Sequence, residues 1–553
     1  MPTITPDLHK PLTLGVITIV TIIWFGLLGY RDLVDPDEGR YAEISREMVA
    51  SGDWITPRLN DLKYFEKPAL QYWMSAISLK LFGINNTAAR LWVALIAFLG
   101  SLWTWYLGKR LFGEPAGFYA FLTLSSGFMY VVMGHLNTLD MSVSVFLFFG
   151  IGALLLAQRQ RENPQANRNW MLFGWAALAL AVLSKGLIGL VLPGIALVFY
   201  SLWQRDWRLW SQLHLGKGLL LFFAITVPWF VLVSRANPEF ARFFFIHEHF
   251  ERFTTEQHGR NEAWWYFLPM LLLGVAPWFW LGLRSLFRPG FAWRARSGGE
   301  FEPERFLWVY IIGIMLFFSV GSSKLPPYIL PIFPALSLLM GQRLARQPGL
   351  PAELVTFGLT LLILVYGAFQ VTAFRDYESA PALLAYRNWI IAAVVIMLAG
   401  GVAAVVLRKR KHHAIIVISV SVLLAFQILL WGFQTQSRHR SSHELATTIQ
   451  TYLKNRPDVP IYTVGYFPHS LPFYLQRHVT LVEYQGELEM GIRQEPEKWL
   501  ADWDEFAERW RAAPQAIAVF DMKSYPGHYR KQMEKLPMKI IYQDTLKLAV
   551  AKQ

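Results

Sequence analysis

Residues 11–54 read "PLTLGVITIVTIIWFGLLGYRDLVDPDEGRYAEISREMVASGDW". The first part, 11–30, is almost entirely apolar and has about the 20 residues that a helix needs to cross a bilayer core. Directly after it come the four carboxylates of Asp35, Asp37, Glu38 and Glu43. The stretch therefore predicts a membrane helix followed by an acidic helix at the membrane surface.

The composition of the whole chain is typical of a polytopic membrane protein. Of its 553 residues, 54% are hydrophobic and only 16% are charged, whereas roughly 25% are charged in a soluble domain. There is no cysteine, which excludes a disulfide framework, a thiolate metal site and a cysteine nucleophile. The net charge of +13 would suggest a nucleic-acid partner in a soluble protein. Here we attribute it to the excess of Lys and Arg in cytoplasmic loops.

Apolar segments of membrane-spanning length recur along the chain. A window of roughly 19 residues predicts about thirteen spans. They lie near residues 11–30, 88–107, 115–133, 139–157, 170–184, 187–203, 217–234, 264–283, 306–320, 328–345, 352–373, 387–407 and 412–432. The first span is too long to be a removed signal peptide and lacks a small-residue cleavage site, so we expect it to remain as an anchor.

Basic residues in the short loops predict the orientation. With a cytoplasmic N-terminus, the loops on the inside carry basic groups such as Lys109–Arg110 and the run 408–411. That distribution satisfies the positive-inside rule. The acidic cluster and the C-terminal tail then lie outside, which indicates the periplasmic side of a bacterial inner membrane.

The chain is predicted to have two domains. Residues 1–433 form a transmembrane catalytic domain with outside loops at 31–87, 235–263 and 321–327. Residues 434–553 form a periplasmic α/β domain, because short β-rich runs alternate there with amphipathic segments. Strands are predicted within 460–466, 478–484, 515–522 and 546–553, and helices within 441–455 and 495–513.

The acidic cluster after the first span opens a predicted helix. Asp35 is expected as its N-cap and Pro36 as its first residue, with Asp37 and Glu38 in the first turn. Acids there can simply balance the helix dipole, and we accept that interpretation for Asp35. One cap already satisfies the helix end, and two further acids repel each other. We therefore predict catalytic roles for Asp37, the preferred acid, and Glu38.

Asp140 is a third candidate acid. It opens the fourth predicted span, on the same outer face as the acidic cluster. An acid at the end of a span can be merely solvated, but an ionisable group at the rim of a membrane is a functional candidate by default. We rank Asp140 behind Asp37, as an acid that positions the substrate or assists catalysis.

Basic residues gather on the same predicted side. Lys67 of "YFEKP", Arg252 of "HEHFERF" and Lys324 of "SSKLPPYILPIFP" come from three separate outside loops. Each could be an interfacial anchor whose charged end reaches the headgroups. Together they favour binding of a lipid phosphate, since Arg matches phosphate oxygens with two donors. Tyr328 adds a hydroxyl beside Lys324, and Lys185 is a further candidate cation.

The outside loops also contain candidate metal ligands. His247 and His249 could bind a divalent ion such as Zn²⁺ together with Glu66. A His-x-His pair has low specificity, and an aromatic-rich surface loop is its more frequent explanation. We further expect Tyr41 and Tyr64, in the first outside loop, to bind substrate.

In three stretches the chain resembles the bacterial lipid A aminoarabinose transferases, which belong with the protein O-mannosyltransferases to the GT-C glycosyltransferases. The stretches are "PDEGRYAEISREMVASGDWITPRLNDLKYFEKP" at 36–68, "HEHFERF" and "SSKLPPYILPIFP". The resemblance covers roughly residues 10–345, and beyond it only the architecture is similar. It implies a GT-C type membrane protein.

The resemblance also implies a reaction. It is the inverting transfer of 4-amino-4-deoxy-L-arabinose from undecaprenyl phosphate to a lipid A phosphate, which gives resistance to cationic peptides such as polymyxin. The basic residues and Tyr328 would stabilise the departing phosphate, and Asp37 would face the acceptor. A phosphate monoester is already largely ionised, with a second pKa of about 6, so Asp37 could instead hold the donor's amino group. We expect a monomer without a nucleic-acid partner.

Two alternatives remain open. Another GT-C enzyme could use a different polyprenyl-phosphate sugar and act on a protein or a glycan. A lipid or sugar flippase would need alternating access and usually an internal repeat. The sequence has no clear repeat, and its acids and bases gather on one face, so the flippase is the weaker alternative.

Overall fold

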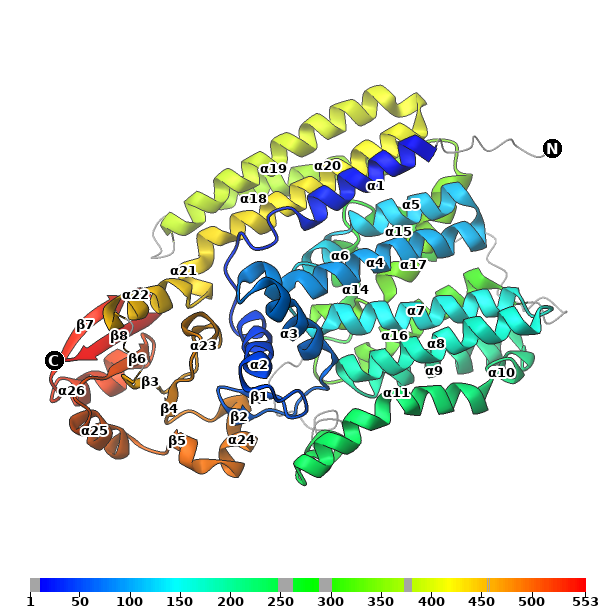
Figure 1. Cartoon of the computed structure of the whole chain (residues 1–553). Coiled ribbons are helices and arrows are strands. Elements are labelled where there is room, and N and C mark those ends of the chain that lie inside the picture. Colours follow the sequence, from blue (N-terminus) through cyan, green and yellow to red (C-terminus); the bar gives the residue numbers. More distant parts are fainter. Residues whose placement is uncertain (1–9, 247–261, 288–300, 372–379, 455, 457) are drawn as a thin grey trace. The chain divides into compact units, whose positions relative to one another are not determined.

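The computed structural model describes residues 10–246, 262–287, 301–371, 380–454, 456 and 458–553 (Figure 1). The chain divides into two compact units. We call Met1–Leu27, Val93–Thr372 and Arg387–Leu430 the helical unit, and Leu28–Trp92, Ala373–Tyr386 and Trp431–Gln553 the mixed unit. The predicted domain boundary at 433 is close to one of these divisions. The first outside loop, however, belongs to the same unit as the C-terminal domain.

The helical unit is built from apolar helices. These are α1 (Lys10–Phe25), α4 (Asn86–Phe112), α5 (Glu114–Ser125), α6 (Phe128–Met133), α7 (Leu139–Arg159), α8 (Pro164–Lys185), α9 (Ile188–Gln204), α10 (Arg208–Ser211), α11 (Leu215–Ala236), α12 (Phe240–Arg242), α14 (Phe267–Gly274), α15 (Phe279–Leu286), α16 (Pro303–Val320), η2 (Pro326–Ile329), α17 (Ile332–Arg346), α18 (Pro351–Gln370), α19 (Ala380–Val406), η4 (Leu407–Lys409) and α20 (Lys411–Gly432). Helices α4, α19 and α20 each begin or end in the mixed unit.

Helices fall in every predicted span. Among the described residues, seven helices are long and apolar enough to cross a membrane, namely α4, α7, α11, α16, α18, α19 and α20. Helices α1 and α9 are apolar but shorter. The fold class expected from composition, a polytopic α-helical membrane protein with a C-terminal α/β part, is confirmed.

Two predicted spans are broken. Segment 115–133 divides into α5 and α6, and segment 264–283 divides into α14 and α15. Polar groups at the two breaks hydrogen-bond to each other. Phe128 N donates to Ala276 O at 3.2 Å, and Trp278 Nε1 donates to Ser126 Oγ at 3.0 Å. Irregular backbone is tolerated at membrane depth where protein groups pair with it. Hydropathy could not reveal these breaks, since apolar residues flank them on both sides.

Small residues bring α5 and α17 close together. A side chain at Gly341 would place its Cβ 2.3 Å from Ala116 O and 2.6 Å from Ala120 N. Only glycine allows such an approach of two backbones, and small residues serve the same purpose in many membrane helix pairs. Helices α7 and α8 form another closely packed pair, which runs side by side in Figure 1.

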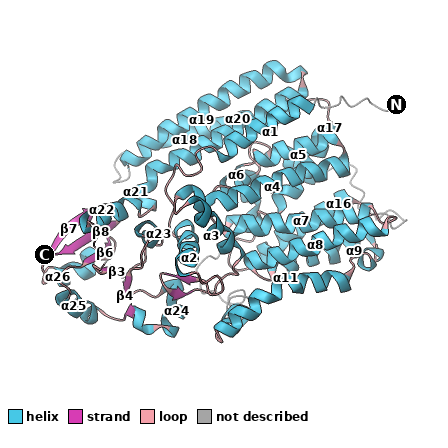
Figure 2. Cartoon of the chain, in the orientation of Figure 1, coloured by secondary structure: helices cyan, strands magenta, loops and turns pink. Residues whose placement is uncertain are grey.

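The mixed unit contains all the strands of the described chain (Figure 2). They are β1 (Arg58–Leu59), β2 (Leu62–Lys63), β3 (Ile461–Val464), β4 (Thr480–Val482), β5 (Trp499–Leu500), β6 (Ile517–Asp521), β7 (Met538–Gln543) and β8 (Lys547–Lys552). The last six form one sheet in the order β5-β4-β3-β6-β8-β7. Pairing is parallel from β5 to β6 and antiparallel through β8 to β7. Trp510, Phe506 and Phe520 pack in its core.

The helices of the mixed unit partly follow the sequence prediction. They are α2 (Asp37–Ser51), α3 (Leu70–Phe82), η5 (Phe433–Gln436), α21 (Ser437–Arg440), α22 (His443–Leu453), α23 (Ser470–Leu475), η6 (Gly486–Leu488), α24 (Glu489–Gln494), η7 (Pro496–Lys498), α25 (Trp503–Ala512), η8 (Tyr525–Tyr529) and α26 (Arg530–Met533). The four predicted strands and α22 are confirmed. The helix predicted for 495–513 is wrong in its first half, where η7 and β5 precede α25, because β4 pairs with Trp499 and Leu500. Strand β7 was not predicted.

Candidate active site

The acidic start of α2 separates its neighbouring carboxylates. Asp37 is the first helical residue, and its side chain is 56% exposed. Arg40, one turn further along the helix, has its Nη1 at 3.6 Å from Asp37 Oδ1. Asp37 is thus a carboxylate open to a substrate.

Glu38 has the opposite setting. Its carboxylate is 2% exposed and pairs with Arg31 at 2.7 Å and with Arg90 at 2.7 Å. Burial opposes ionisation of Glu38, but the charges of the two guanidinium groups outweigh it and lower its pKa. Arg90 also donates to the carbonyls of Arg31 and Asp32, at 2.6 and 2.8 Å. The pairing ties the segment before α2 to α4 and favours a structural role for Glu38 over the predicted catalytic one.

Asp35 does not cap α2, and the predicted N-cap is wrong. The N-cap position is Pro36, without a side-chain cap. The carboxylate of Asp35, which is half-buried, instead accepts hydrogen bonds from Ser470 N at 2.6 Å, Ser470 Oγ at 3.0 Å and Ser442 Oγ at 3.3 Å. Gly39 makes this possible, since a Cβ there would lie 2.5 Å from Ser470 N. Tertiary donors from α23 compete successfully with the helix end for this acid.

Arg40 connects Asp37 to Glu487, a half-buried acid of the C-terminal part. Its Nη2 lies 3.5 Å from Glu487 Oε1, and its Nη1 donates to the Tyr64 hydroxyl at 3.5 Å. His469 Nε2 donates to the same Glu487 carboxylate. Burial opposes ionisation of Glu487, but the hydrogen bond from His469 and the charges of His469 and Arg40 lower its pKa to about 2. Sequence patterns did not indicate this network, because its members are far apart along the chain.

The other predicted residues of the first outside loop lie in the mixed unit. Tyr64 is 1% exposed, and burial raises the pKa of its hydroxyl well above the usual value. Tyr41 is buried with its ring 6.1 Å from that of Tyr72. Lys67 Nζ donates to the carbonyl of Glu66 at 2.8 Å. The ring of Tyr64 is thus packed, and only its hydroxyl, through Arg40, is linked to the α2 acids.

In the helical unit, three singled-out residues come together. Lys185, at the end of α8, donates a hydrogen bond to Asp140 in the first turn of α7. Its ammonium also lies 5.2 Å from the centre of the Tyr328 ring, within the range of a cation–π contact. Lys185 therefore lies between the predicted acid and the predicted hydroxyl donor.

Lys324 is held by two backbone carbonyls, one in its own loop and one before α14. Its side chain is buried, and Nζ donates to Gly321 O at 2.7 Å and Glu262 O at 2.9 Å. These bonds stabilise the irregular turn that the prolines at 326 and 327 impose before α17. Arg252, His247 and His249 lie outside the described residues.

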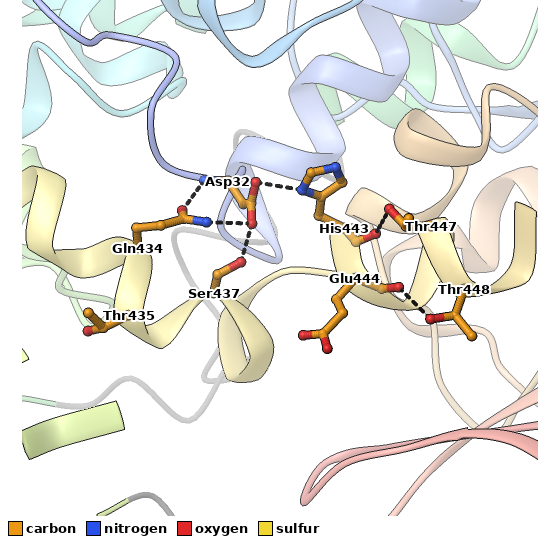
Figure 3. A pocket seen from close by; sticks show the side chains of 8 residues that line it. All are labelled: Asp32, Gln434, Thr435, Ser437, His443, Glu444, Thr447 and Thr448. Atoms are coloured by element: carbon orange, nitrogen blue, oxygen red, sulfur yellow. Dashed lines mark hydrogen bonds and ion pairs between the residues drawn. The ribbon is translucent and has the colours of Figure 1, made fainter. Parts of the chain in front are cut away.

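A cavity of about 460 Å³ has Asp32 in its wall (Figure 3). It is lined by Asp32, Gln434, Thr435, Ser437, His443, Glu444, Thr447 and Thr448. The Asp32 carboxylate accepts hydrogen bonds from Gln434 at 2.9 Å, from His443 at 2.8 Å and from Ser437. Burial opposes ionisation of Asp32, but these bonds lower its pKa to about 2. The acid organises the turn into α22, and no sequence pattern indicated this role.

Two family models match the chain. The model of the aminoarabinose transferase C-terminal domain matches residues 445–552. The model of dolichyl-phosphate-mannose-protein mannosyltransferases matches residues 12–244. The first match covers most of the C-terminal α/β part, and the second covers α1 to α12.

Sequence relatives share one name, undecaprenyl phosphate-alpha-4-amino-4-deoxy-L-arabinose arabinosyl transferase. The Erwinia tasmaniensis protein is 37% identical over 57% of this chain and 56% of its own length. A Pseudomonas fluorescens protein is 32% identical over 69% of this chain and 70% of its own length. The chain belongs to the aminoarabinose transferase family. It is therefore a membrane glycosyltransferase of the GT-C type, as the resemblance implied.

Solved structures agree with membership of the aminoarabinose transferase family. The crystal structure of ArnT from Cupriavidus metallidurans bound to undecaprenyl phosphate has a TM-score of 0.90 and 36% sequence identity, over 98% of both chains. The apo structure of the same protein gives a TM-score of 0.89. An Archaeoglobus fulgidus oligosaccharyltransferase, at 12% identity and a TM-score of 0.54, is similar in fold alone.

Proposed function

We propose that this chain transfers 4-amino-4-deoxy-L-arabinose from undecaprenyl phosphate to a phosphate of lipid A. The observation that carries the proposal is the 36% identity, over 98% of both chains, to an ArnT that was crystallised with undecaprenyl phosphate. The names of the sequence relatives support the same donor. Modified lipid A would carry added positive charge, which repels cationic peptides such as polymyxin.

The proposed place of the reaction is the periplasmic face of a bacterial inner membrane, and the proposed acting form is the monomer. Basic loop residues support this orientation through the positive-inside rule. A polyprenyl phosphate and lipid A both lie in a membrane, so an enzyme that joins them needs its reacting groups at headgroup depth.

In the proposed mechanism, Asp37 is the principal acid. It is the exposed carboxylate at the start of α2, whereas Glu38 forms ion pairs with two arginines. Breaking the sugar–phosphate bond develops positive charge at the anomeric carbon and negative charge on the departing phosphate. Attack from the opposite face of the sugar inverts the anomeric centre. A carboxylate near the reacting sugar stabilises this transition state more than the ground state.

The acceptor decides what Asp37 does. A hydroxyl acceptor needs a general base, whereas a phosphate monoester is largely ionised near neutral pH. With lipid A phosphate as acceptor, Asp37 holds the ammonium group of the donor sugar. The Asp37→Asn substitution should then reduce transfer from a donor without the amine less than it reduces transfer from the aminoarabinose donor.

In the helical unit, Asp140 and Lys185 are proposed to act as a pair beside Tyr328. The ion pair holds the Lys185 ammonium against the Asp140 carboxylate and near the Tyr328 ring. Binding of phosphate by Lys67, Arg252, Lys324 and Tyr328 remains a prediction for each residue separately. Contacts of substrate with Tyr41 and Tyr64, and a divalent ion at Glu66, His247 and His249, are likewise predictions.

The test is a transfer assay with purified protein, undecaprenyl-phosphate-linked aminoarabinose and lipid A, read by mass spectrometry of the lipid product. Asp37→Asn should abolish transfer while the melting temperature stays unchanged, because the side chain is exposed. Asp35→Asn is the matched control two residues earlier in the chain, and it should lower stability more than turnover. Transfer by Asp37→Asn at the wild-type rate would contradict the assignment.

A second candidate function rests on the mannosyltransferase model that matches residues 12–244. The enzyme could then glycosylate a protein or a glycan from another polyprenyl-phosphate sugar. A panel of lipid-linked sugars, each offered with lipid A or with an acceptor peptide, separates the two. Transfer to the peptide and none to lipid A would favour the second function.

A further inference from the structure

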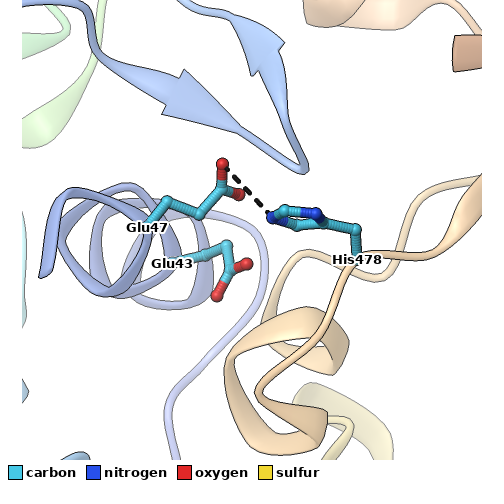
Figure 4. A group of neighbouring side chains, drawn as sticks. All are labelled: Glu43, Glu47 and His478. Carbon is cyan, nitrogen blue, oxygen red and sulfur yellow. Dashed lines mark ion pairs between the residues drawn. The ribbon is translucent and has the colours of Figure 1, made fainter. Parts of the chain in front are cut away.

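A cluster of ligand-type side chains lies on α2, away from Asp37. Glu43 and Glu47 are one helical turn apart, so both project from the same face. His478, from the segment before β4, completes the group (Figure 4). One ligand atom from each of the three residues lies within 4.8 Å of the other two. The three side chains come from two separate parts of the mixed unit.

The surrounding backbone fixes this convergence. Asn60 Nδ2 donates to Val479 O at 2.7 Å, and Val479 N donates to Asn60 Oδ1 at 2.8 Å. The residue next to His478 is thereby locked against the turn between β1 and β2. The same turn contacts the cluster directly, because Asp61 N donates to Glu47 Oε2 at 3.0 Å. Tertiary hydrogen bonds therefore place the backbone next to His478 beside Glu47.

One carboxylate oxygen of the cluster is not hydrogen-bonded within the described part of the chain. Glu47 is 5% exposed, and its Oε1 is buried without a hydrogen-bond donor among the described residues. The His478 Nε2 atom is 3.6 Å from Glu47 Oε2, too long for a hydrogen bond. An unpaired buried carboxylate oxygen costs free energy unless something charged or polar satisfies it. A bound cation would do so.

We propose that Glu43, Glu47 and His478 form a site for a divalent transition-metal ion of the Zn²⁺ class. Carboxylate oxygens and an imidazole nitrogen are donors that Zn²⁺ accepts, with three protein ligands and an open position for water. Arg46 donates to both oxygens of Glu43 at 2.7 Å. A carboxylate has about four acceptor positions, so this pairing leaves Glu43 able to bind the ion as well.

The site goes beyond the proposed transfer reaction, because none of its three residues is assigned to the sugar or to the lipid phosphate. It is also separate from the predicted group of Glu66, His247 and His249. The ion would join α2, which carries Asp37 at its start, to the chain segment that leads into β4. Its expected effect is on the stability of the mixed unit, with metal content as the direct readout.

The test uses the full-length protein in detergent, with His247→Asn and His249→Asn present in every sample to silence the other predicted site. After chelation, Zn²⁺ or Co²⁺ alone is titrated into this background and into its His478→Ala and Glu47→Gln derivatives. His528→Ala, which changes an exposed histidine of the same unit, is the matched control. Bound metal is counted by elemental analysis, and the visible absorption of Co²⁺ reports its ligands.

We expect the background and the control to bind one ion with the same affinity. The His478→Ala and Glu47→Gln proteins should lose at least roughly 100-fold in metal affinity. This is more than is typically lost when a residue that only hydrogen-bonds to a metal ligand is removed. His478 is 48% exposed, so its removal leaves the fold intact and decides the question even if Glu47→Gln unfolds. Equal metal content and equal Co²⁺ absorption in the background and His478→Ala proteins would overturn the proposal.

Discussion

Replacing Glu38 by Gln tests whether this residue is a structural acid or a catalytic one. The carboxylate is 2% exposed, and its two partners, Arg31 and Arg90, are 5% and 0% exposed. The amide keeps the shape but cannot neutralise two buried guanidinium groups. Removing one partner of a buried ion pair typically costs about 3–5 kcal/mol. We expect a loss of that size in the free energy of unfolding.

The assay is thermal unfolding of the detergent-purified protein, followed in parallel with transfer activity. For a compact unit of this size, each kcal/mol lowers the melting temperature by roughly 2–4 °C, so Glu38→Gln should melt roughly 6–20 °C lower. The matched control is Glu505→Gln, which breaks the 2.9 Å pair with Arg509 at 41% and 50% exposure. Such an exposed pair contributes about 0–1 kcal/mol, so the control should melt almost as the wild type does.

Activity separates the two interpretations of Glu38. A structural acid loses transfer only to the extent that the protein unfolds, so activity measured well below the melting temperature should largely persist. A Glu38→Gln protein with an unchanged melting temperature and no transfer would refute the structural reasoning. It would also restore the catalytic role that the sequence suggested.

Three further predictions concern other contacts. Lys185→Met should lower transfer efficiency roughly tenfold or more, because it removes a charge-assisted bond to Asp140. Adding Asp140→Asn to this variant should restore the melting temperature but not the transfer. Recovery of transfer in the double variant would contradict a direct role of the pair. Gly39→Ala should lower the free energy of unfolding by about 1–3 kcal/mol, since the new Cβ would lie 2.5 Å from Ser470 N. The measurement is thermal unfolding, and an unchanged melting temperature would show that the contact can relax. The pKa of Glu487 is lowered in the fold to about 2 from 4.5, so its stabilising effect is present above about pH 4.5 and is lost as the pH falls toward 2. The melting temperature of Glu487→Gln should therefore fall less over this range than that of the wild type, and parallel curves would contradict the shift.

The sequence predicted the membrane architecture because hydropathy is a local property. A helix in lipid must satisfy its backbone within itself, so an apolar run of sufficient length is enough to identify it. The same locality explains the errors. The breaks at Ser126 and Ala276 are paired with each other across the fold, and no window along the chain contains both. Strand β5 lies in the first half of a predicted helix for a similar reason, since its partner β4 lies elsewhere in the sequence.

Candidate residues could be found from the sequence, but their roles could not be separated. Asp35, Asp37 and Glu38 are equivalent as neighbours at a helix start, and helix-end electrostatics predicts similar positions for all three. Tertiary contacts make them different. Arg90 and Arg31 neutralise Glu38, Ser470 binds Asp35, and Asp37 is left exposed. Whether a carboxylate is buried, paired or open depends on groups brought from distant parts of the chain, and only the folded structure decides that.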